Sequence, residues 1–570
     1  MATSREARAE HGLEYVVIGC TAIYLLWLGV AESAALVAGG HHLLPNLASS
    51  LSGLTALVMH GNPVAGWSPA DRRDLPSEAA FVLISLSELS LITASVIAIW
   101  RKQGGKKRAK TSRAPARREI REHLSLASVR EKTTHLRKDV PNVRTVRGEE
   151  IGLLLGRETT TRQQVWAAGD DSVLMVGPPG SGKTASFIIP AIVEAPGAVV
   201  ATSTRDEVVS RTAKWRQKGD RPCWVFAPQM DMDIEGVNIL RWSPLAGCDN
   251  RLTAIARATV LMKGGAGFGS KSATNADFWE ASGIAVMRCY LLAAATGGKT
   301  MADVAAWSTT PGASEPVKLL TSVAPEWATE LRQLAASPGG MPASIWAGVR
   351  RALDCFSDPR VLDVCSTGTN FVIEELLEAK GTAYFVGAAS AQLSVAPLIA
   401  ALVEAVADVA RQPQGRGNLT VPLSLILDEA ANIAPLPTLP NLLSEGGGSG
   451  IQTLVVLQSL AQGRHRWSDA EMDAMWDAST IKLILPGMSH AGDLEAISKL
   501  CGEIEEMRTA KTTGSGGATT SEQPQSKPAW TPEQIRSLQT GHALLLPRRL
   551  RPVEIESEPY WEREARWDSG

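Results

Sequence analysis

The chain has 570 residues, too many for one ordinary core, because a domain typically contains about 100 to 200 residues. With 44% hydrophobic and 20% charged residues, the composition is that of a globular protein and excludes a disordered, collagen-like or coiled-coil chain. Its 57 Lys and Arg against 59 Asp and Glu give a net charge of −2, so any contact with nucleic acid has to be local.

Two apolar stretches near the N-terminus have the length of membrane-spanning helices. Glu32 is the single charged residue of 15–37, and Glu88 is the single charged residue of 79–100. Crossing a bilayer takes about 20 apolar residues. A cleaved signal peptide followed by a buried helix is the alternative, but the first stretch is too long for the apolar region of a signal peptide, and no small-residue cleavage site clearly follows it. The pattern predicts a membrane anchor over 1–100, with two transmembrane helices and an external loop.

The charges around these stretches predict an orientation for the anchor. Nine Lys and Arg and no acidic residue lie within 101–118, whereas the loop between the two stretches contains only two Arg. Positive charge marks the cytoplasmic side of a membrane segment. We therefore expect a multi-pass protein of the inner or plasma membrane, with both termini in the cytoplasm. The basic juxtamembrane segment, 101–150, is interpreted first as a lipid and topology signal and second as a DNA contact.

The seven cysteines do not form the close pairs of a zinc site or a disulfide framework. No CxxC is present, and the closest two cysteines, Cys355 and Cys365, are ten residues apart. We expect buried free thiols in a reducing compartment.

After residue 150, short apolar runs alternate with helical stretches, which is typical of an α/β fold. Most of the runs are continuously apolar, as parallel strands are when both faces of a sheet are covered. The runs are 172–176, 198–200, 223–228, 382–387, 423–430, 451–459 and 481–487. Between 251 and 380 helical periodicity continues without strands, which predicts an all-α insertion. The low-complexity segment 510–528 predicts a flexible linker or loop.

The strongest local signal is the sequence GPPGSGKT, which fits GxxxxGK[ST] and lies between a predicted strand and a helical run. Its glycines let backbone N–H groups close around phosphate oxygens, Lys183 reaches the β and γ phosphates, and the Thr184 hydroxyl is offered to Mg²⁺. The candidate ATP-binding residues are Gly177, Pro178, Pro179, Gly180, Ser181, Gly182, Lys183 and Thr184. The motif predicts a protein that binds ATP and Mg²⁺.

Two acidic residues, Asp428 and Glu429, follow the apolar run that begins at residue 423. Asp428 is expected to hold Mg²⁺ through water, and Glu429 to accept a proton from the attacking water. Such a pair also occurs at helix caps and turns, but its combination with the phosphate-binding motif favours catalysis. Gln458 ends a later run and could sense the γ phosphate or position water; a surface glutamine is the alternative. The sequence predicts a P-loop ATPase with Lys183, Glu429 and Gln458 as catalytic residues.

This order of elements resembles the coupling proteins of type IV secretion systems, the TraG/TraD-like ATPases that pump DNA during conjugation. The shared order is two N-terminal spans, the phosphate-binding loop, a helical insertion, the acidic pair and a strand that ends in Gln. Smaller similarities are VVATSTRDE at 199–207, VFAP at 225–228, RWSPL at 241–245 and DFWE at 277–280. The resemblance covers nearly the whole chain.

The resemblance implies a RecA-like P-loop nucleotide-binding domain with an inserted all-α domain, preceded by two transmembrane helices. The expected parts after the juxtamembrane segment are a first nucleotide-binding part over 151–250, the insertion over 251–380, a second nucleotide-binding part over 381–509, the linker or loop, and a C-terminal strand and tail over 529–570. The implied activity is that of a DNA-translocating motor, a homo-hexameric nucleoside triphosphate hydrolase. It would deliver single-stranded DNA with a relaxase, or an effector protein recognised by the insertion, into a type IV secretion or conjugation channel.

The sequence departs from the family pattern at two places. Family members often carry an Arg just before the strand that ends in Gln, where it can act in a neighbouring subunit, but 445–450 reads EGGGSG here. Arg464 and Arg466 are candidate substitutes, or else solvated surface residues. The usual Asp of the 199–207 segment is Ser203. The source of an arginine finger therefore stays open.

Two other functions compete with DNA coupling. The first is a coupling receptor for protein effectors only. Without the nine basic residues of 101–118, 48 Lys and Arg remain against 59 Asp and Glu, and this acidic remainder favours such a receptor. The second is a DNA translocase similar to FtsK. That family places its acidic strand closer to the phosphate-binding loop and ends in a winged helix, for which the chain after residue 528 is too short.

Overall fold

The computed structural model describes scattered residues between 29 and 90 and most of 115–568. The gaps in the second range are 116, 135, 138, 141, 266–275, 367, 389–391, 413–420 and 515–516. The chain divides into two compact units, Met1–Lys110 and Thr111–Gly570.

In the N-terminal unit, the described residues form short helical pieces and a small apolar cluster. Helix α3 (Asp71–Asp74) consists of four charged residues. Ala31, Trp67, Leu75 and Phe81 are buried together. Most of the first predicted span, the end of the second and the basic residues 101–114 lie outside the described residues.

The predicted localisation, a multi-pass membrane protein, is wrong on the evidence of the described helices. None of them combines the length and the apolar character that a bilayer crossing demands. Helices α10 (Ala276–Thr296) and α17 (Gln392–Arg411) are long enough. However, charged residues such as Arg288 in α10 and Glu404 in α17 interrupt their apolar sequences, and both helices belong to the second unit.

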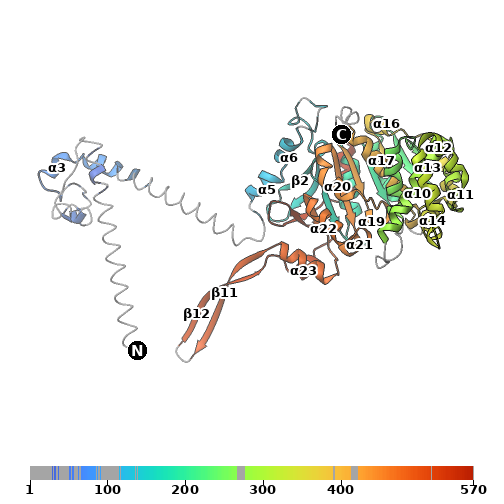
Figure 1. The fold of residues 1–570 in the computed structure, drawn as a ribbon. Coiled ribbons are helices and arrows are strands. Elements are labelled where there is room, and N and C mark those ends of the chain that lie inside the picture. The colour runs from blue at the N-terminus through green and yellow to red at the C-terminus, as the bar shows by residue number, and fades with distance from the viewer. Residues whose placement is uncertain are drawn as a thin grey trace. The chain divides into compact units, whose positions relative to one another are not determined.

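The second unit is built on one sheet of twelve strands (Figure 1). The strands are β1 (Gly152–Glu158), β2 (Gln164–Ala168), β3 (Val173–Val176), β4 (Val199–Ser203), β5 (Cys223–Phe226), β6 (Val237–Ile239), β7 (Thr382–Val386), β8 (Leu423–Leu427), β9 (Ile451–Leu457), β10 (Ile481–Ile484), β13 (His542–Pro547) and β14 (Val553–Glu556). Their order in the sheet is β2-β1-β14-β13-β10-β3-β9-β8-β4-β7-β5-β6.

From β10 to β6, each neighbouring pair of strands is parallel. All seven apolar runs of the sequence lie in this part of the sheet, so their prediction as parallel strands is confirmed. The other four strands pair antiparallel at one side. Because β13 is antiparallel to β10 and β14 is antiparallel to β13, β14 points the same way as β3 and ends at the same edge of the sheet.

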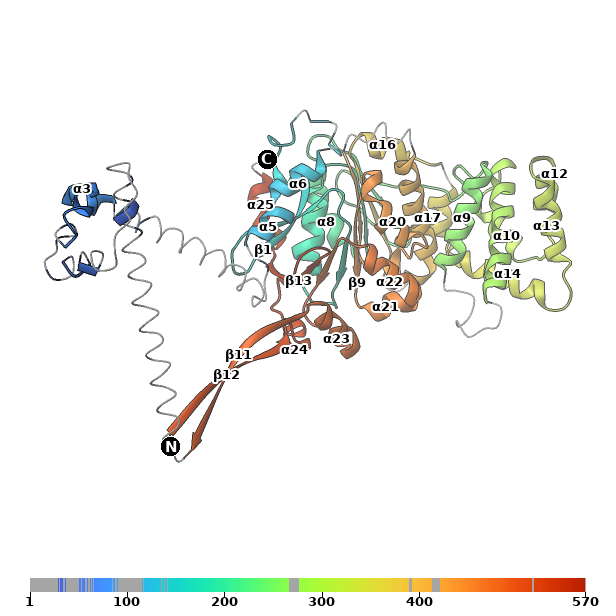
Figure 2. The same ribbon diagram turned by 60° about the vertical axis from the view of Figure 1, so that its left-hand side comes forward.

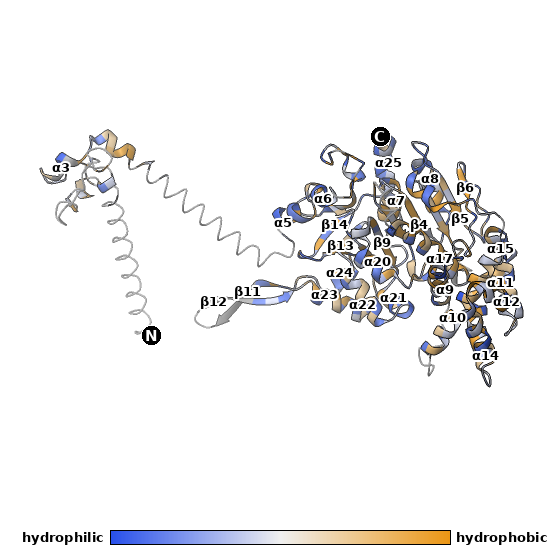
Figure 3. Ribbon diagram, turned by 45° about the horizontal axis from the view of Figure 1, so that its top comes forward, coloured by the Kyte–Doolittle hydropathy of each residue, from blue (hydrophilic) through white to orange (hydrophobic). Residues whose placement is uncertain are grey.

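Helices cover both faces of this sheet. Those outside the insertion are α5 (Arg117–His123), α6 (Leu126–Thr133), α7 (Ile189–Glu194), α8 (Glu207–Arg216), α17, α19 (Ala430–Ile433), α20 (Leu439–Glu445), α21 (Leu460–Arg466), α22 (Asp469–Ala478), α23 (Ala491–Leu500), α24 (Pro532–Arg536) and α25 (Tyr560–Asp568), with the shorter turns η1 (Gly148–Glu150), η2 (Thr184–Ile188) and η4 (Gly447–Ser449). Alternate residues of one strand enter different cores: Leu425 and Leu427 of β8 enter one, and Ile426 enters the other. Figure 3 shows hydrophobic colour in the central strands between these helices.

The described residues of 251–380 form helices and no strand. These helices are α9 (Arg251–Gly264), α10, α11 (Met301–Ser308), α12 (Ser314–Val323), α13 (Pro325–Ala335), α14 (Met341–Ala352), η3 (Asp354–Ser357), α15 (Pro359–Ser366) and α16 (Ile373–Glu378). In Figure 2, α10 to α14 lie together at the end of the unit opposite to α5 and α6. Tyr290 of α10 joins two neighbours: its hydroxyl donates to the carbonyl of Trp307 at 3.1 Å and accepts from the Trp346 indole at 3.0 Å.

Most of the segment 510–528, interpreted from the sequence as a flexible linker or loop, lies in a pair of strands. Strands β11 (Glu503–Gly514) and β12 (Gly517–Pro528) pair antiparallel from Glu503 and Pro528 to Gly514 and Gly517. The Thr residues of this segment favour extended backbone. The sequence of these strands is polar at most positions, so no apolar alternation predicts them.

The six cysteines that the structure describes are buried, and none of them is in a disulfide bond. The reducing compartment stays a prediction. Cys20 lies outside the described residues.

Arg216, the last residue of α8, is fully buried and joins α8 to β7 and to the segments that precede β4 and β7. Its guanidinium donates to Thr382 Oγ1 at 2.7 Å, to the Gly197 carbonyl at 2.7 Å and to the carbonyls of Ala195 and Lys380. Burial lowers its pKa to about 10, so the group stays charged at neutral pH.

We expect Arg216→Met to destabilise the second unit by about 3 kcal/mol or more, because several buried acceptors lose their donor. Thermal unfolding followed by circular dichroism measures the effect. Lys214→Met, at an exposed position of the same helix, is the control and should change stability by less than about 1 kcal/mol. Equal effects of the two substitutions would contradict the role given to Arg216.

Candidate functional site

The phosphate-binding motif forms the turn between β3 and η2. Its backbone is bonded to β9, the neighbour of β3 in the sheet, because the Gly177 N–H donates to the Leu457 carbonyl at 2.9 Å. Gly180 and Gly182 have φ values of +81° and +85°, in the left-handed region that glycine enters without strain. A Cβ at position 177 would lie 2.6 Å from Leu485 Cδ1. The three glycines therefore permit a loop that other residues would distort.

Two polar side chains of this loop are buried at the end of the sheet. Ser181 is 5% exposed and Lys183 is 7% exposed. The Ser181 hydroxyl is buried without a hydrogen-bond partner among the described residues. A loop of backbone N–H groups with a buried lysine and an unsatisfied hydroxyl has the donors that a phosphate group requires.

Asp428 and Glu429 follow β8 at the same edge of the sheet. Asp428 is 5% exposed, and its Oδ1 is buried without a hydrogen-bond partner in the described part of the chain. Burial raises the pKa of Asp428 to about 6; the Lys183 ammonium opposes this rise, and the Glu429 carboxylate adds to it. An unsatisfied carboxylate oxygen beside a phosphate-binding loop fits a hydrated Mg²⁺ ion, which prefers oxygen ligands.

Glu429 has a left-handed backbone, with φ of +51° and ψ of +42°. Such a conformation costs about 1 kcal/mol or more for a residue other than glycine and is concentrated at functional sites. The strain supports the interpretation of the acidic pair as a working element and not as an ordinary helix cap, because the Glu429 side chain makes no capping hydrogen bond to α19.

Gln458 comes directly after β9, whose last residue pairs with Val176 of β3, so Gln458 lies beside the start of the loop. A chain of amides links it to the acidic pair. The Gln458 N–H donates to Gln462 Oε1 at 3.2 Å, and the Gln462 amide donates to Asn432 Oδ1 at 2.9 Å. The Asn432 amide in turn donates to Glu429 Oε2 at 3.4 Å.

Asn432 and Gln462 belong to this group but were not predicted from the sequence. Each lies within one helical turn of a predicted site residue, three after Glu429 and four after Gln458. That spacing puts side chains on one face of a helix and was the available signal.

Arg464 and Arg466 are both held by contacts within their own chain. Arg464 bonds Asp493 at 2.8 Å, and Asp493 is 2% exposed. Arg466 donates to the carbonyls of Gly264 and Gly265 at the end of α9. Burial lowers the pKa of Arg466 to about 10. Both side chains are half-buried and make polar contacts within their own chain.

Residues 126–569 show to which protein family the chain belongs. The family model described as Type IV secretory system Conjugative DNA transfer matches residues 126–569. The chain belongs to this family. The predicted resemblance to type IV coupling proteins is thereby confirmed.

Solved structures show the same fold for this member of the conjugative DNA transfer family. One is the unbound bacterial conjugative coupling protein TrwBdeltaN70, with 17% identity and a TM-score of 0.53, which covers 71% of this chain and 88% of that one. Another is TrwB in complex with ADPNP, with 17% identity, a TM-score of 0.51 and coverage of 68% and 86%. A third is TrwB with ADP and Mg²⁺, with 16% identity, a TM-score of 0.51 and coverage of 68% and 85%. A search of curated proteins found no match.

The raised pKa of Asp428 makes a prediction about stability and pH for this conjugative DNA transfer protein. Without nucleotide or Mg²⁺, the protonated carboxyl is favoured in the folded state. The protonated Asp428 carboxyl stabilises the folded state fully below pH 3.8. This stabilisation, about 3 kcal/mol, is lost as the pH rises through about 6. Asp428→Asn, which cannot ionise, should lack this loss. As the pH rises from 4.5 to 8, the melting temperature of the variant should increase relative to that of the original protein. A difference in melting temperature that does not change with pH would contradict the prediction.

Proposed function

We propose that this protein is a Mg²⁺-dependent ATPase that couples hydrolysis to the transfer of a DNA–protein complex into a type IV secretion or conjugation channel. The observation that carries the proposal is the buried group formed by Lys183 and Asp428. An unsatisfied carboxylate oxygen lies next to a complete phosphate-binding loop, in a chain whose residues 126–569 match the conjugative transfer family. The TrwB complexes with ADPNP and with ADP and Mg²⁺ support the choice of ligands.

In this proposal the loop N–H groups and Lys183 bind the phosphates of ATP. Thr184 and Asp428 hold Mg²⁺, Asp428 through a water molecule. When bound, the cation neutralises charge on the β and γ phosphates. Glu429 accepts the proton of the attacking water, and Gln458 positions that water against the γ phosphate. The amide chain through Gln462 and Asn432 keeps Glu429 and the end of β9 at a fixed separation.

The proposed partners are single-stranded DNA, a relaxase or effector protein, the secretion channel and further copies of the chain in a hexameric ring. Membership in the conjugative transfer family supports the DNA and the secretion machinery. We propose the helical insertion as the recognition domain, because its helices α10 to α14 gather at one end of the unit (Figure 2).

Substitutions at Lys183 and Glu429 test the nucleotide chemistry. Lys183→Ala removes the charge that reaches the phosphates and should abolish ATP binding and hydrolysis. Glu429→Gln removes the proton acceptor alone, so it should bind ATP normally and hydrolyse it about 100-fold or more slowly. Binding of a fluorescent ATP analogue and phosphate release are the measurements.

The control for these substitutions is Glu495→Gln, at an exposed position of α23, which should hydrolyse ATP at the original rate. Normal turnover in Glu429→Gln would remove this carboxylate from the mechanism. Normal binding by Lys183→Ala would move the nucleotide to another site.

The effector-only receptor is separated from the DNA motor by the dependence of hydrolysis on DNA. With its net charge of −2, the protein should bind single-stranded DNA only through a local basic patch. We expect ATPase activity to rise several-fold on addition of single-stranded DNA and the rise to weaken as salt increases. Activity that is indifferent to DNA but increases with an effector protein would favour the receptor.

A further inference from the structure

The C-terminal tail, defined as Ser557–Asp568, lies against the helix that follows the phosphate-binding loop. It begins where β14 ends, at the edge of the sheet that carries the nucleotide site. The Ser557 N–H donates to the Gly541 carbonyl at 2.8 Å. The turn at Thr540 and Gly541 is itself beside the loop, since a Cβ on Gly182 would lie 3.6 Å from Thr540 Cγ2 and 3.9 Å from the Gly541 nitrogen.

The helix after the loop begins irregularly, and a proline explains why. Residues Thr184–Ile188 form a π-helical turn, η2, before the regular helix α7. In an α-helix the carbonyl of Ser186 would accept from the N–H of residue 190, but residue 190 is a proline, which has no N–H and crowds that carbonyl. Widened turns of this kind are frequent at functional sites.

The tail supplies a donor to this carbonyl. The Ser557 hydroxyl donates to the Ser186 carbonyl oxygen at 2.9 Å, and the two residues are only 4% and 6% exposed. A buried carbonyl that lacks its helical donor costs free energy unless another group bonds it. Ser557 thus replaces the donor that Pro190 cannot supply. The carbonyl concerned is that of Ser186, two residues after Thr184, the last residue of the phosphate-binding motif.

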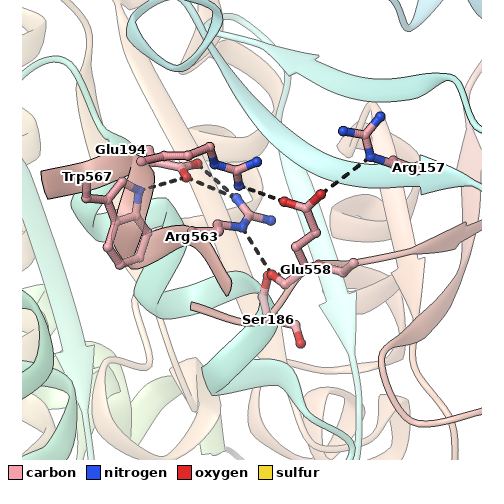
Figure 4. A network of polar contacts seen from close by, with 8 residues as sticks. Arg157, Ser186, Glu194, Glu558, Arg563 and Trp567 are labelled. Atoms are coloured by element: carbon pink, nitrogen blue, oxygen red, sulfur yellow. Dashed lines mark hydrogen bonds and ion pairs between the residues drawn. The ribbon is translucent and has the colours of Figure 1, made fainter. Parts of the chain in front are cut away.

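The tail also holds the other end of the same helix (Figure 4). Glu194, the last residue of α7, accepts from the Arg563 guanidinium at 3.0 Å and from the Trp567 indole at 3.1 Å. Arg563 is fully buried, and Glu194 is 5% exposed. Burial raises the pKa of Glu194, and the charge of Arg563 opposes the rise.

The start of the tail is tied both to the sheet and to the helix α25. The carboxylate of Glu558 bonds Arg566 at 2.6 Å and Arg157 of β1 at 3.4 Å, while its carbonyl accepts from Arg563 at 3.1 Å. The helix α25 is thereby tied to the sheet as well as to α7. A support anchored at both ends resists a shift of η2 and α7 along their axis.

We infer that the C-terminal tail is a positioning element of the nucleotide site, with Ser557 as its positioning residue. The inference rests on the proposed ATP site. The tail fixes the helix whose first turn carries Thr184, and with it the direction of the loop N–H groups toward a bound phosphate. Loss of the Ser557 hydroxyl therefore weakens nucleotide binding, and not merely the stability of the fold.

The test measures the Kd of the full chain for ADP with Mg²⁺ after Ser557→Ala. We expect affinity to fall about threefold to tenfold, the range of one lost hydrogen bond. The matched control is Ser498→Ala, which removes another buried serine hydroxyl that donates to a carbonyl, that of Trp530, at 2.5 Å. The control should lower the melting temperature by a similar amount and leave affinity within about twofold of the original.

A second comparison tests the route through the carbonyl. Pro190→Ala restores an N–H that can donate to Ser186, so in that background Ser557→Ala should cost less than about twofold in affinity. Should Ser557→Ala not fold, Trp567→Phe releases the far end while keeping the ring against Trp215, and at least about a twofold loss of affinity is expected.

Each contrary result has a distinct meaning. If the original protein binds no nucleotide, the proposed function fails. If it binds nucleotide and Ser557→Ala or Trp567→Phe binds equally well, the tail is only a structural support and the inference is overturned. An undiminished effect of Ser557→Ala in the Pro190→Ala background would overturn the role of the Ser186 carbonyl.

Discussion

Parallel pairing of β3, β9 and β8 is the constraint on which the rest of this molecule depends. Strands covered on both faces are mostly apolar along their length, so charged side chains gather at their ends. Because the three strands run the same way and are adjacent, their ends meet at one edge. The loop after β3, the acidic pair after β8 and Gln458 after β9 are brought together by this geometry alone.

The parallel part of the sheet could be predicted because each of its strands is a continuous apolar run. The antiparallel side could not, since β1 and β2 are mixed in character, with half-buried Arg157 and Gln164 among apolar residues. A single C-terminal strand was expected where the chain forms two, β13 and β14. Pairing at the side of a sheet depends on neighbours distant in sequence, which no local pattern records.

The candidate site, too, contains residues that could be predicted from the sequence and residues that could not. Lys183, Thr184 and Asp428 were predictable, because their spacing from glycines or from a strand end is dictated by phosphate and Mg²⁺ chemistry. The roles of Arg464 and Arg466 were not, since an arginine in sequence carries no sign of the partner that it will find. Asp493 lies beyond the next strand, and Gly264 lies in the insertion, about 200 residues away.

The helix α21 has a mechanical consequence that follows from its shortness. It is seven residues long, about 10 Å, and such a rod does not bend. Near one end, Gln462 belongs to the amide chain that reaches Glu429; at the other end, Arg466 holds the end of α9, the first helix of the insertion. The two ends cannot move independently. A displacement of Gln462 by a fraction of an ångström is therefore transmitted through one rigid helix to the C-terminal end of α9.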